Sequence, residues 1–191
     1  MCGMTNTAQQ ISARLESCFA HSGFAEPGVD AVREAAGVSL RTLYKYFPSR
    51  EDMVVGALDH RHRRYLDGLK EGVPDGPGPA PIHHMIERVA AWMTDEASTG
   101  CLFLSALAAH PGSAAIQAAV ARHKAETRAV LAEFAQRATP ALSGARRGAI
   151  ADALFVMHEG QVAASATCGA ESAANAAHSL ADTILTERMT Q

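Results

Sequence analysis

The chain has 191 residues, of which 48% are hydrophobic and only 5% aromatic, and its formal net charge is −3 at pH 7. This length suffices for one large or two small cores, and the acidic balance argues against a general nucleic-acid coat protein, which needs excess cations over its whole surface. Four cysteines stand singly, so neither a disulfide framework nor a zinc site is indicated. The sequence shows no leader-like N-terminal pattern and no membrane-span-length apolar segment, which predicts a cytoplasmic protein without membrane contact.

Two helices are expected near the N-terminus. Residues 7–22 carry apolar side chains every three to four positions, and Gly23 supplies a stop. Residues 29–36 predict a second helix, in which Val29 belongs to the inward face. Gly28 stands immediately before this helix, at a position where Ser or Thr would cap it better.

The next stretch predicts a short helix with a chemically rich outer face. Ser39 can accept the free N–H groups of a new helix, and Leu43 and Phe47 lie four residues apart and face inward together. Cations, hydroxyls and aromatic rings are left outside, on a surface with no structural need for them. That face suits a DNA groove; its members are Arg41, Thr42, Tyr44, Lys45 and Tyr46.

A longer helix is expected to follow over residues 49–70. Pro48 ends the short helix, and Ser49 and Asp52 have the spacing of a capping box that starts the next one. Arg50 therefore lies at a positive helix N-terminus, where backbone N–H groups and a guanidinium can share one phosphate.

Residues 11–58 resemble the N-terminal domain of the TetR family of bacterial transcriptional regulators. The family often has a phosphate-touching Ser or Thr where this chain has Gly28, so one positioning contact is expected to be missing or replaced by a backbone N–H. The resemblance implies DNA binding by Ser39, Leu40, Arg41, Thr42, Tyr44, Lys45, Tyr46 and Arg50. It is carried by Phe19, Gly23, Phe24, Val32, Ala35, Ala36, Gly37, Val38, Ser39, Thr42, Leu43, Tyr44, Tyr46, Phe47, Ser49 and Arg50.

Charge and proline content divide the chain. Residues 1–64 hold 8 Lys+Arg against 7 Asp+Glu, whereas residues 65–191 hold 9 against 13, so the cationic side is N-terminal. The basic run at residues 60–64 is interpreted first as a solvated helix surface. The alternative is an attraction to DNA or to an acidic neighbour.

A loop rich in Pro and Gly follows at residues 71–81. The predicted domains are a helix-turn-helix domain at 1–50, a connecting helix and loop at 51–80, and an effector-binding and dimerisation domain at 81–191.

Helical periodicity continues to the C-terminus without any strand pattern, so the predicted fold class is all-α with about nine helices. Helices are expected over 82–97, 100–110, 113–138, 143–168 and 172–189. The segment 100–110 is apolar nearly all round and should be buried at the centre. The last two helices are rich in small residues, which fits either a four-helix dimer interface or tight packing within one chain. The resemblance favours a homodimer.

The C-terminal helices also carry the residues of an expected effector site. Their aromatic and thioether side chains usually only form core, but in the family these helices surround an effector pocket. The inward positions of these helices carry few charged residues, so the implied effector is a small, largely apolar molecule. The expected contacts are Met85, Val89, Trp92, Met93, Phe103, Leu107, Thr127, Phe134, Phe155 and His158.

No catalytic, metal or cofactor site is expected. The histidines lack a helical spacing that pairs them as metal ligands, and no nucleophile stands beside a base. The sequence therefore predicts a TetR-like repressor, a homodimer that binds a palindromic double-stranded DNA operator and is released by its effector. The alternatives are an all-α enzyme or small-molecule carrier that keeps the helix-turn-helix as scaffold, and a ligand-independent DNA-binding activator.

Overall fold

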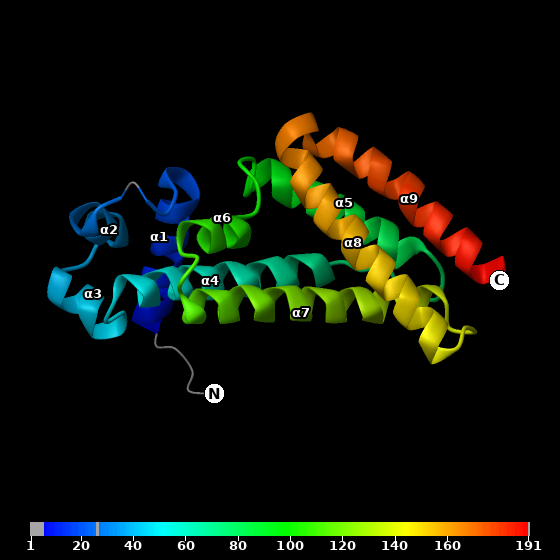
Figure 1. Cartoon of the computed structure of the whole chain (residues 1–191), viewed down its shortest axis with the longest axis horizontal. Helices are drawn as coiled ribbons and strands as arrows, with labels where there is room; N and C mark the ends of the chain where they lie inside the picture. The colour runs from blue at the N-terminus through cyan, green and yellow to red at the C-terminus, as the bar shows by residue number, and fades with distance from the viewer. Residues whose placement is uncertain (1–5, 26, 191) are drawn as a thin grey trace. The chain divides into compact units, whose positions relative to one another are not determined.

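The computed structural model describes residues 6–25 and 27–190, with side chains described up to residue 186. Within these residues the chain is all-α and contains no strand (Figure 1). None of the described helices is long and apolar enough to cross a membrane. The helices are α1 (Asn6–Ser22), α2 (Val29–Ala36), α3 (Leu40–Tyr46), α4 (Arg50–Lys70), α5 (Ala80–Asp95), α6 (Leu102–Ala109), α7 (Ala114–Ala138), α8 (Gly144–Cys168) and α9 (Ala170–Thr190).

The helices form two compact units that interleave along the chain. Unit 1 comprises residues 1–64 and 102–123, and unit 2 comprises residues 65–101 and 124–191. The predicted domains were contiguous, whereas α6 and the first part of α7 belong to unit 1. Contacts within unit 1 explain this difference, because Arg122 forms an ion pair with Asp59 of α4 and His110 meets the ring of Phe24 edge-on at 6.0 Å.

Unit 1 is built on the apolar faces of α1 and α4. Ile11, Leu15 and Phe19 of α1 are fully buried, as their spacing predicts. Val29 is 40% exposed, so its predicted inward position is wrong. It is the first residue of α2, before the turn whose Val32 and Ala36 are buried.

One further expectation for unit 1 needs correction. The segment predicted as a buried central helix is α6, yet its Leu104 is 47% exposed while Phe103 and Ala106 are buried. An apolar composition around the whole helix therefore does not imply burial on every side, because this helix buries only one face.

Unit 2 packs α5, α8 and α9 side by side, and Figure 1 shows the three ribbons together. Its core is formed by apolar residues of these helices together with the C-terminal parts of α4 and α7. Ser143 caps α8, since its hydroxyl accepts from the Arg146 N–H. Val156 and Leu180, which the periodicity places with the packed faces of α8 and α9, are 69% and 47% exposed.

Candidate functional site

The helix α3 presents the surface on which the sequence prediction centres. Ser39 caps it, because the Ser39 hydroxyl accepts from the Thr42 N–H at 3.1 Å. Leu43 is fully buried and Phe47, just after the helix, is 6% exposed. These two apolar residues anchor the helix and leave its opposite face to solvent, as predicted.

Most of the predicted DNA-contacting residues lie on that open face. Leu40 is 42% exposed and Tyr44 39% exposed, and Ser39, Arg41 and Lys45 are also exposed. The helix contains two cations and no acid. Two other predicted residues, Thr42 and Tyr46, are half-buried, and the Lys45 ammonium lies 5.4 Å from the centre of the Tyr46 ring.

The turn that leads into α3 requires a glycine. Gly37 has a φ of 64°, and its N–H bonds to the carbonyls of Arg33 and Glu34 at the end of α2. A Cβ at this position would lie 2.1 Å from the Arg14 guanidinium, which donates to the Ala36 carbonyl at 2.9 Å. At the other end of α2, Gly28 provides no side-chain cap, as expected from the sequence.

The start of α4 confirms the capping box but gives Arg50 a different surrounding from the predicted one. The N–H of Asp52 donates to the Ser49 hydroxyl at 3.1 Å, and the N–H of Ser49 donates to the Asp52 carboxylate at 2.9 Å. The Arg50 guanidinium donates to the Phe24 carbonyl at 2.9 Å and lies 4.9 Å from the centre of the Phe19 ring. In this structure it therefore points to the α1–α2 corner, and its phosphate contact stays a prediction.

The basic run of α4 is only partly a solvated face. Three of its five residues meet Glu16 of α1, which is 2% exposed. The Glu16 carboxylate accepts from Arg61 at 3.3 Å and from Arg64 at 2.9 Å, and it lies 2.5 Å from His60 Nδ1. Arg61 is itself only 3% exposed, whereas Arg63 is exposed. The solvated surface is thus right for Arg63, and the alternative, attraction to an acidic neighbour, describes the contacts of Arg61 and Arg64.

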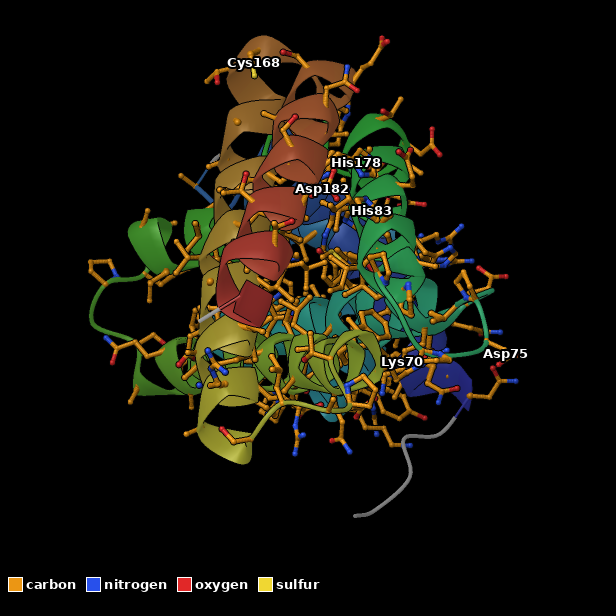
Figure 2. The ribbon with its side chains drawn as sticks, turned by 90° about the vertical axis from the view of Figure 1, so that its right-hand side faces the viewer. Lys70, Asp75, His83, Cys168, His178 and Asp182 are labelled. Carbon is orange, nitrogen blue, oxygen red and sulfur yellow. The ribbon has the colours of Figure 1, made fainter. Side chains whose placement is uncertain are left out.

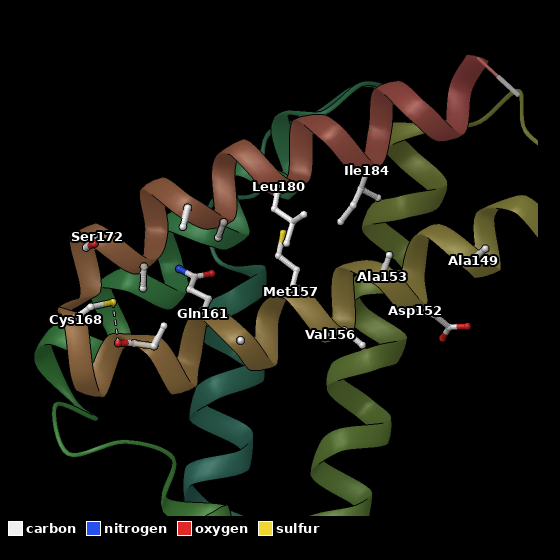
Figure 3. Close-up of a pocket in the computed structure, with 15 residues that line it drawn as sticks. Ala149, Asp152, Ala153, Val156, Met157, Gln161, Cys168, Ser172, Leu180 and Ile184 are labelled. Carbon is white, nitrogen blue, oxygen red and sulfur yellow. Dashed lines mark hydrogen bonds between the residues drawn. The ribbon is translucent and has the colours of Figure 1, made fainter.

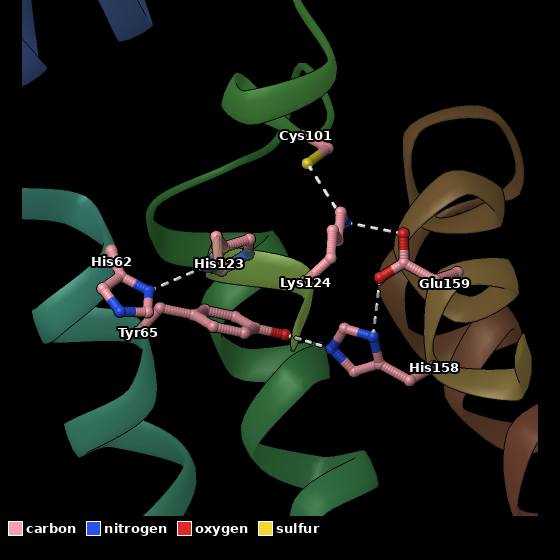
Figure 4. A network of polar contacts seen from close by, with 7 residues as sticks. All are labelled: His62, Tyr65, Cys101, His123, Lys124, His158 and Glu159. Atoms are coloured by element: carbon pink, nitrogen blue, oxygen red, sulfur yellow. Dashed lines mark hydrogen bonds and ion pairs between the residues drawn. The ribbon is translucent and has the colours of Figure 1, made fainter. Parts of the chain in front are cut away.

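Unit 2 contains a chain of polar contacts inside its core (Figure 4). The Tyr65 hydroxyl lies 2.5 Å from His158 Nε2, and His158 Nδ1 lies 3.2 Å from the Glu159 carboxylate. Lys124 donates to the same carboxylate at 2.6 Å and lies 4.0 Å from Cys101 Sγ.

The surroundings of these contacting side chains determine which of them carry protons. Burial raises the pKa of Tyr65, so the phenol keeps its proton and donates to His158 Nε2. Burial also acts to raise the pKa of Glu159, but hydrogen bonds from His158 and Lys124 outweigh it and lower that pKa to about 2. A neutral His158 that donates from Nδ1 to an ionised Glu159 satisfies every contact.

The predicted effector residues fall into both units. Met85, Val89, Met93 and Phe134 belong to the buried core of unit 2, and Trp92 and Phe155 pack against that core half-buried. Thr127 and His158 of the same unit are buried at 0% and 1% exposure. Phe103 and Leu107 instead belong to unit 1, where the Phe103 ring stacks on His123 with centroids 3.6 Å apart.

The inward face of unit 2 is less apolar than predicted. Lys124 and Glu159 have side chains only 19% and 27% exposed, although the sequence indicated few inward charges. Phe155 is nearly parallel to the His158 ring, and Trp92 meets Tyr65 edge-on at 5.2 Å. The polar chain is therefore bordered by aromatic rings.

A groove of about 800 Å³ runs between α8 and α9 (Figure 3). Small residues such as Gly160 and Ala164 line it together with the exposed Val156 and Leu180. Gln161 lies in its wall; the amide donates to the Ile86 carbonyl at 2.8 Å, but the buried amide oxygen has no hydrogen-bond partner in the part of the chain that the structure describes. Such an atom is costly to leave unpaired.

Among the described residues, no group of three or more His, Cys, Asp or Glu side chains is arranged to hold a metal ion. Cys18, Cys101 and Cys168 form no disulfide with one another, while Cys2 lies outside the described residues.

The buried charges were not predicted from the sequence, although the position of Glu16 in α1 indicates one of them. Glu16 lies next to Leu15 and three residues before Phe19, which places it on the inward side of α1. An acid on that side, together with a basic run elsewhere, is a sign of a buried ion pair. Lys124 and Glu159 are 35 residues apart in sequence and belong to different helices, so no local spacing predicts their contact.

Comparisons with known proteins agree with the helix-turn-helix geometry. The model of the bacterial regulatory proteins, tetR family, matches residues 13–57. The HTH-type transcriptional regulator LuxR of Vibrio harveyi is 34% identical over 65 residues, and this match spans 34% of the chain and 32% of that relative. The chain thus matches only about a third of the length of this relative.

Solved structures share the fold over nearly the whole chain. A TetR-family transcriptional regulator of Streptomyces coelicolor, SCO4454, has a TM-score of 0.77 at 19% identity, with 93% of this chain and 95% of that chain covered. The reduced form of NemR from E. coli has a TM-score of 0.76 at 19% identity, with 94% and 97% covered. A TetR transcription regulator of Haloarcula marismortui has a TM-score of 0.78 at 14% identity, with 94% and 98% covered. Residues 13–57 thus match the N-terminal model of the bacterial regulatory proteins, tetR family, and the chain as a whole shares the fold of the solved TetR-family regulators.

Proposed function

We propose that the protein is a repressor that binds a palindromic operator as a homodimer and is released when a small, largely apolar effector binds unit 2. The observation that carries the DNA-binding part is the open face of α3. Two apolar residues, Leu43 and Phe47, fix the helix from behind, and Arg41, Tyr44 and Lys45 extend from its exposed side. A helix presented in this way enters a major groove with its N-terminal residues at the base edges.

The groove between α8 and α9 supports a homodimer. Its small residues allow helices of a second copy to approach closely, and Val156 and Leu180 supply exposed apolar area for the contact. On α9 the small residues Ala174 and Ala181 are buried in the core of one copy, whereas Ala176 lines the groove and is available to a second copy in this proposal.

Substitution of Val156 by arginine tests the dimer. Val156 is 69% exposed, so Val156→Arg leaves the fold of one copy intact but places an unpaired charge in the interface. Sedimentation should then show a monomer at micromolar concentration, whereas the control Ala132→Arg, at an exposed position of α7 that does not line the groove, stays dimeric. A dimer that survives Val156→Arg overturns this interface.

The effector part of the proposal rests on the aromatic rings around the polar chain of unit 2. Trp92 is the single tryptophan, it is half-buried, and it meets the ring of Tyr65. An effector that binds here changes Trp92 emission. We expect a mostly apolar molecule, with a polar group that meets the Lys124–Glu159 pair.

The whole proposal is tested with the DNA upstream of the gene itself. A gel shift should show a specific complex that an unrelated sequence of equal length does not compete away. Candidate effectors should then dissolve the complex and change Trp92 emission over the same concentration range. Binding without sequence preference contradicts the repressor proposal, and release without any change in Trp92 emission contradicts the effector site.

A further inference from the structure

Four titratable side chains join α5 to α9 on the surface of unit 2. His83 and Glu87 are one helical turn apart on α5, and His178 and Asp182 are one turn apart on α9. Figure 2 shows His83, His178 and Asp182 next to one another. None of the four takes part in the DNA, effector or dimer sites proposed above.

The two imidazole rings meet head-on. The Nδ1 atoms of His83 and His178 lie 2.7 Å apart, which is at the short end for a hydrogen bond. The ring planes differ by only 20°, and the ring centres are 5.0 Å apart. This separation exceeds the contact between the nitrogens by about two ring radii, so each Nδ1 points straight at the other.

The opposite nitrogens of the rings meet carboxylates. His178 Nε2 lies 2.5 Å from the Glu87 carboxylate, and His83 Nε2 lies 3.0 Å from the Asp182 carboxylate. Both carboxylates are about two-thirds exposed, so they are solvated and act as acceptors only. Each of these contacts therefore needs a proton on Nε2.

A count of protons determines the charge of the pair. The three contacts need three ring protons, whereas two neutral imidazoles carry two. We propose that His83 and His178 share three ring protons and act as one singly charged unit, a proton-operated clasp between α5 and α9. The two flanking carboxylates, which carry two negative charges, stabilise this single positive charge, and the central proton lies between the two Nδ1 atoms.

Gain or loss of a proton opens the clasp. Loss of the third proton as the pH rises leaves one of the three contacts without a hydrogen. Gain of a fourth proton as the pH falls sets two N–H groups face to face. The clasp is therefore strongest at intermediate pH and weaker on both sides.

Other charged groups near this pair are engaged elsewhere. On α5, Arg88 bonds to the Glu71 carboxylate and the Gly68 carbonyl, and His84 Nε2 lies 2.9 Å from the Glu71 carbonyl. On α8, which packs against both helices, Asp152 pairs with Arg128 and Glu159 with Lys124. Glu87 and Asp182 are thus the charged groups that act on the protons of the His83–His178 pair. Because α9 also lines the groove, the clasp links pH to the dimer, a consequence that rests on the proposed function.

Nuclear magnetic resonance of the full-length protein tests the proton count directly. Ring ¹⁵N signals, recorded between pH 5 and 9, should show both Nε2 atoms protonated and one proton shared by the two Nδ1 atoms at intermediate pH. An Nε2 atom without a proton throughout that range overturns the proposal. This readout involves neither DNA nor effector, so its outcome is independent of the repressor proposal.

A variant pair measures the mechanical effect. His178→Phe keeps a planar ring but removes all contacts, and it should speed amide hydrogen exchange in α9 about tenfold at intermediate pH, with the ratio to wild type falling on both sides. The matched control is His84→Phe, the same change at the neighbouring histidine outside the clasp, and its α9 exchange should follow wild type at every pH. A His178→Phe ratio that is constant, or that changes in one direction only, overturns the clasp.

Discussion

The two compact units bury charge in different ways. In unit 1 the Glu16 side chain is 3% exposed and meets two arginines and one histidine of α4, so one carboxylate holds several groups in place. In unit 2 the Glu159 side chain is 27% exposed and forms the middle of a chain that leads from Lys124 to the buried Tyr65. A buried charge that loses its partner is costly, whereas a half-exposed pair exchanges partners with solvent. We therefore expect the loss of a charge to cost more stability in unit 1 than in unit 2.

The largest effect on the free energy of unfolding is expected from Glu16→Gln in unit 1. The change leaves Arg61, which is 3% exposed, without its buried counter-charge, and should lower the free energy of unfolding by about 3–5 kcal/mol. The control is Asp30→Asn, because Asp30 is 97% exposed and lies 3.9 Å from Arg33, where the expected change is below about 0.5 kcal/mol. Denaturant unfolding measures both variants. Equal effects of the two substitutions would mean that Glu16 does not hold unit 1.

A smaller effect is expected from Tyr65→Phe in unit 2. The substitution keeps the ring but removes the hydroxyl that donates to the buried His158, and should cost about 1–3 kcal/mol in unfolding free energy. Tyr44→Phe is the matched control, since Tyr44 is 39% exposed and its loss of a hydroxyl should leave stability unchanged. A neutral result for Tyr65→Phe would show that the polar chain carries no energy.

The smallest effect concerns the pH dependence of Glu159. Hydrogen bonds to His158 and Lys124 lower its pKa to about 2, from a usual value of 4.5. A depressed acid pKa contributes stability that is complete above the unfolded value and disappears as the pH falls through the folded one. The stability difference between wild type and Glu159→Gln should therefore be larger at pH 7 than at pH 3. A difference that is the same at both values would contradict the assignment.

Sequence patterns predicted the helices well because each of them carries local signals. The caps at Ser39 and Ser49 are both present in the structure, and α1 ends directly before the predicted stop at Gly23. The anchors of α3 were also foreseen, since a spacing of four residues places Leu43 and Phe47 on one face. Local spacing thus determined the exposed face of the candidate DNA-binding helix.

The same patterns did not predict side-chain contacts between residues that are far apart in the sequence. Arg50 has the position of a phosphate ligand in sequence, but its partners are the Phe24 carbonyl and the Phe19 ring, more than 25 residues away. The assignment of α6 to unit 1 likewise depends on packing between segments far apart in the chain. Side-chain partners across such distances are chosen by tertiary packing, which no helical period encodes.

The central claim, that the exposed face of α3 reads DNA, is tested most directly by Arg41. Arg41 lies at the second position of α3 and is exposed, where an arginine can bond O6 and N7 of one guanine. Binding isotherms on operator variants should show that Arg41→Ala costs about 1–3 kcal/mol and relaxes the preference at one base position per half-site. The control Lys70→Ala removes an equal charge from α4 in unit 2 and should leave base preference unchanged. A uniform loss of affinity with Arg41→Ala, accompanied by a smaller salt slope, would make Arg41 a phosphate contact and contradict the claim that this face reads the sequence.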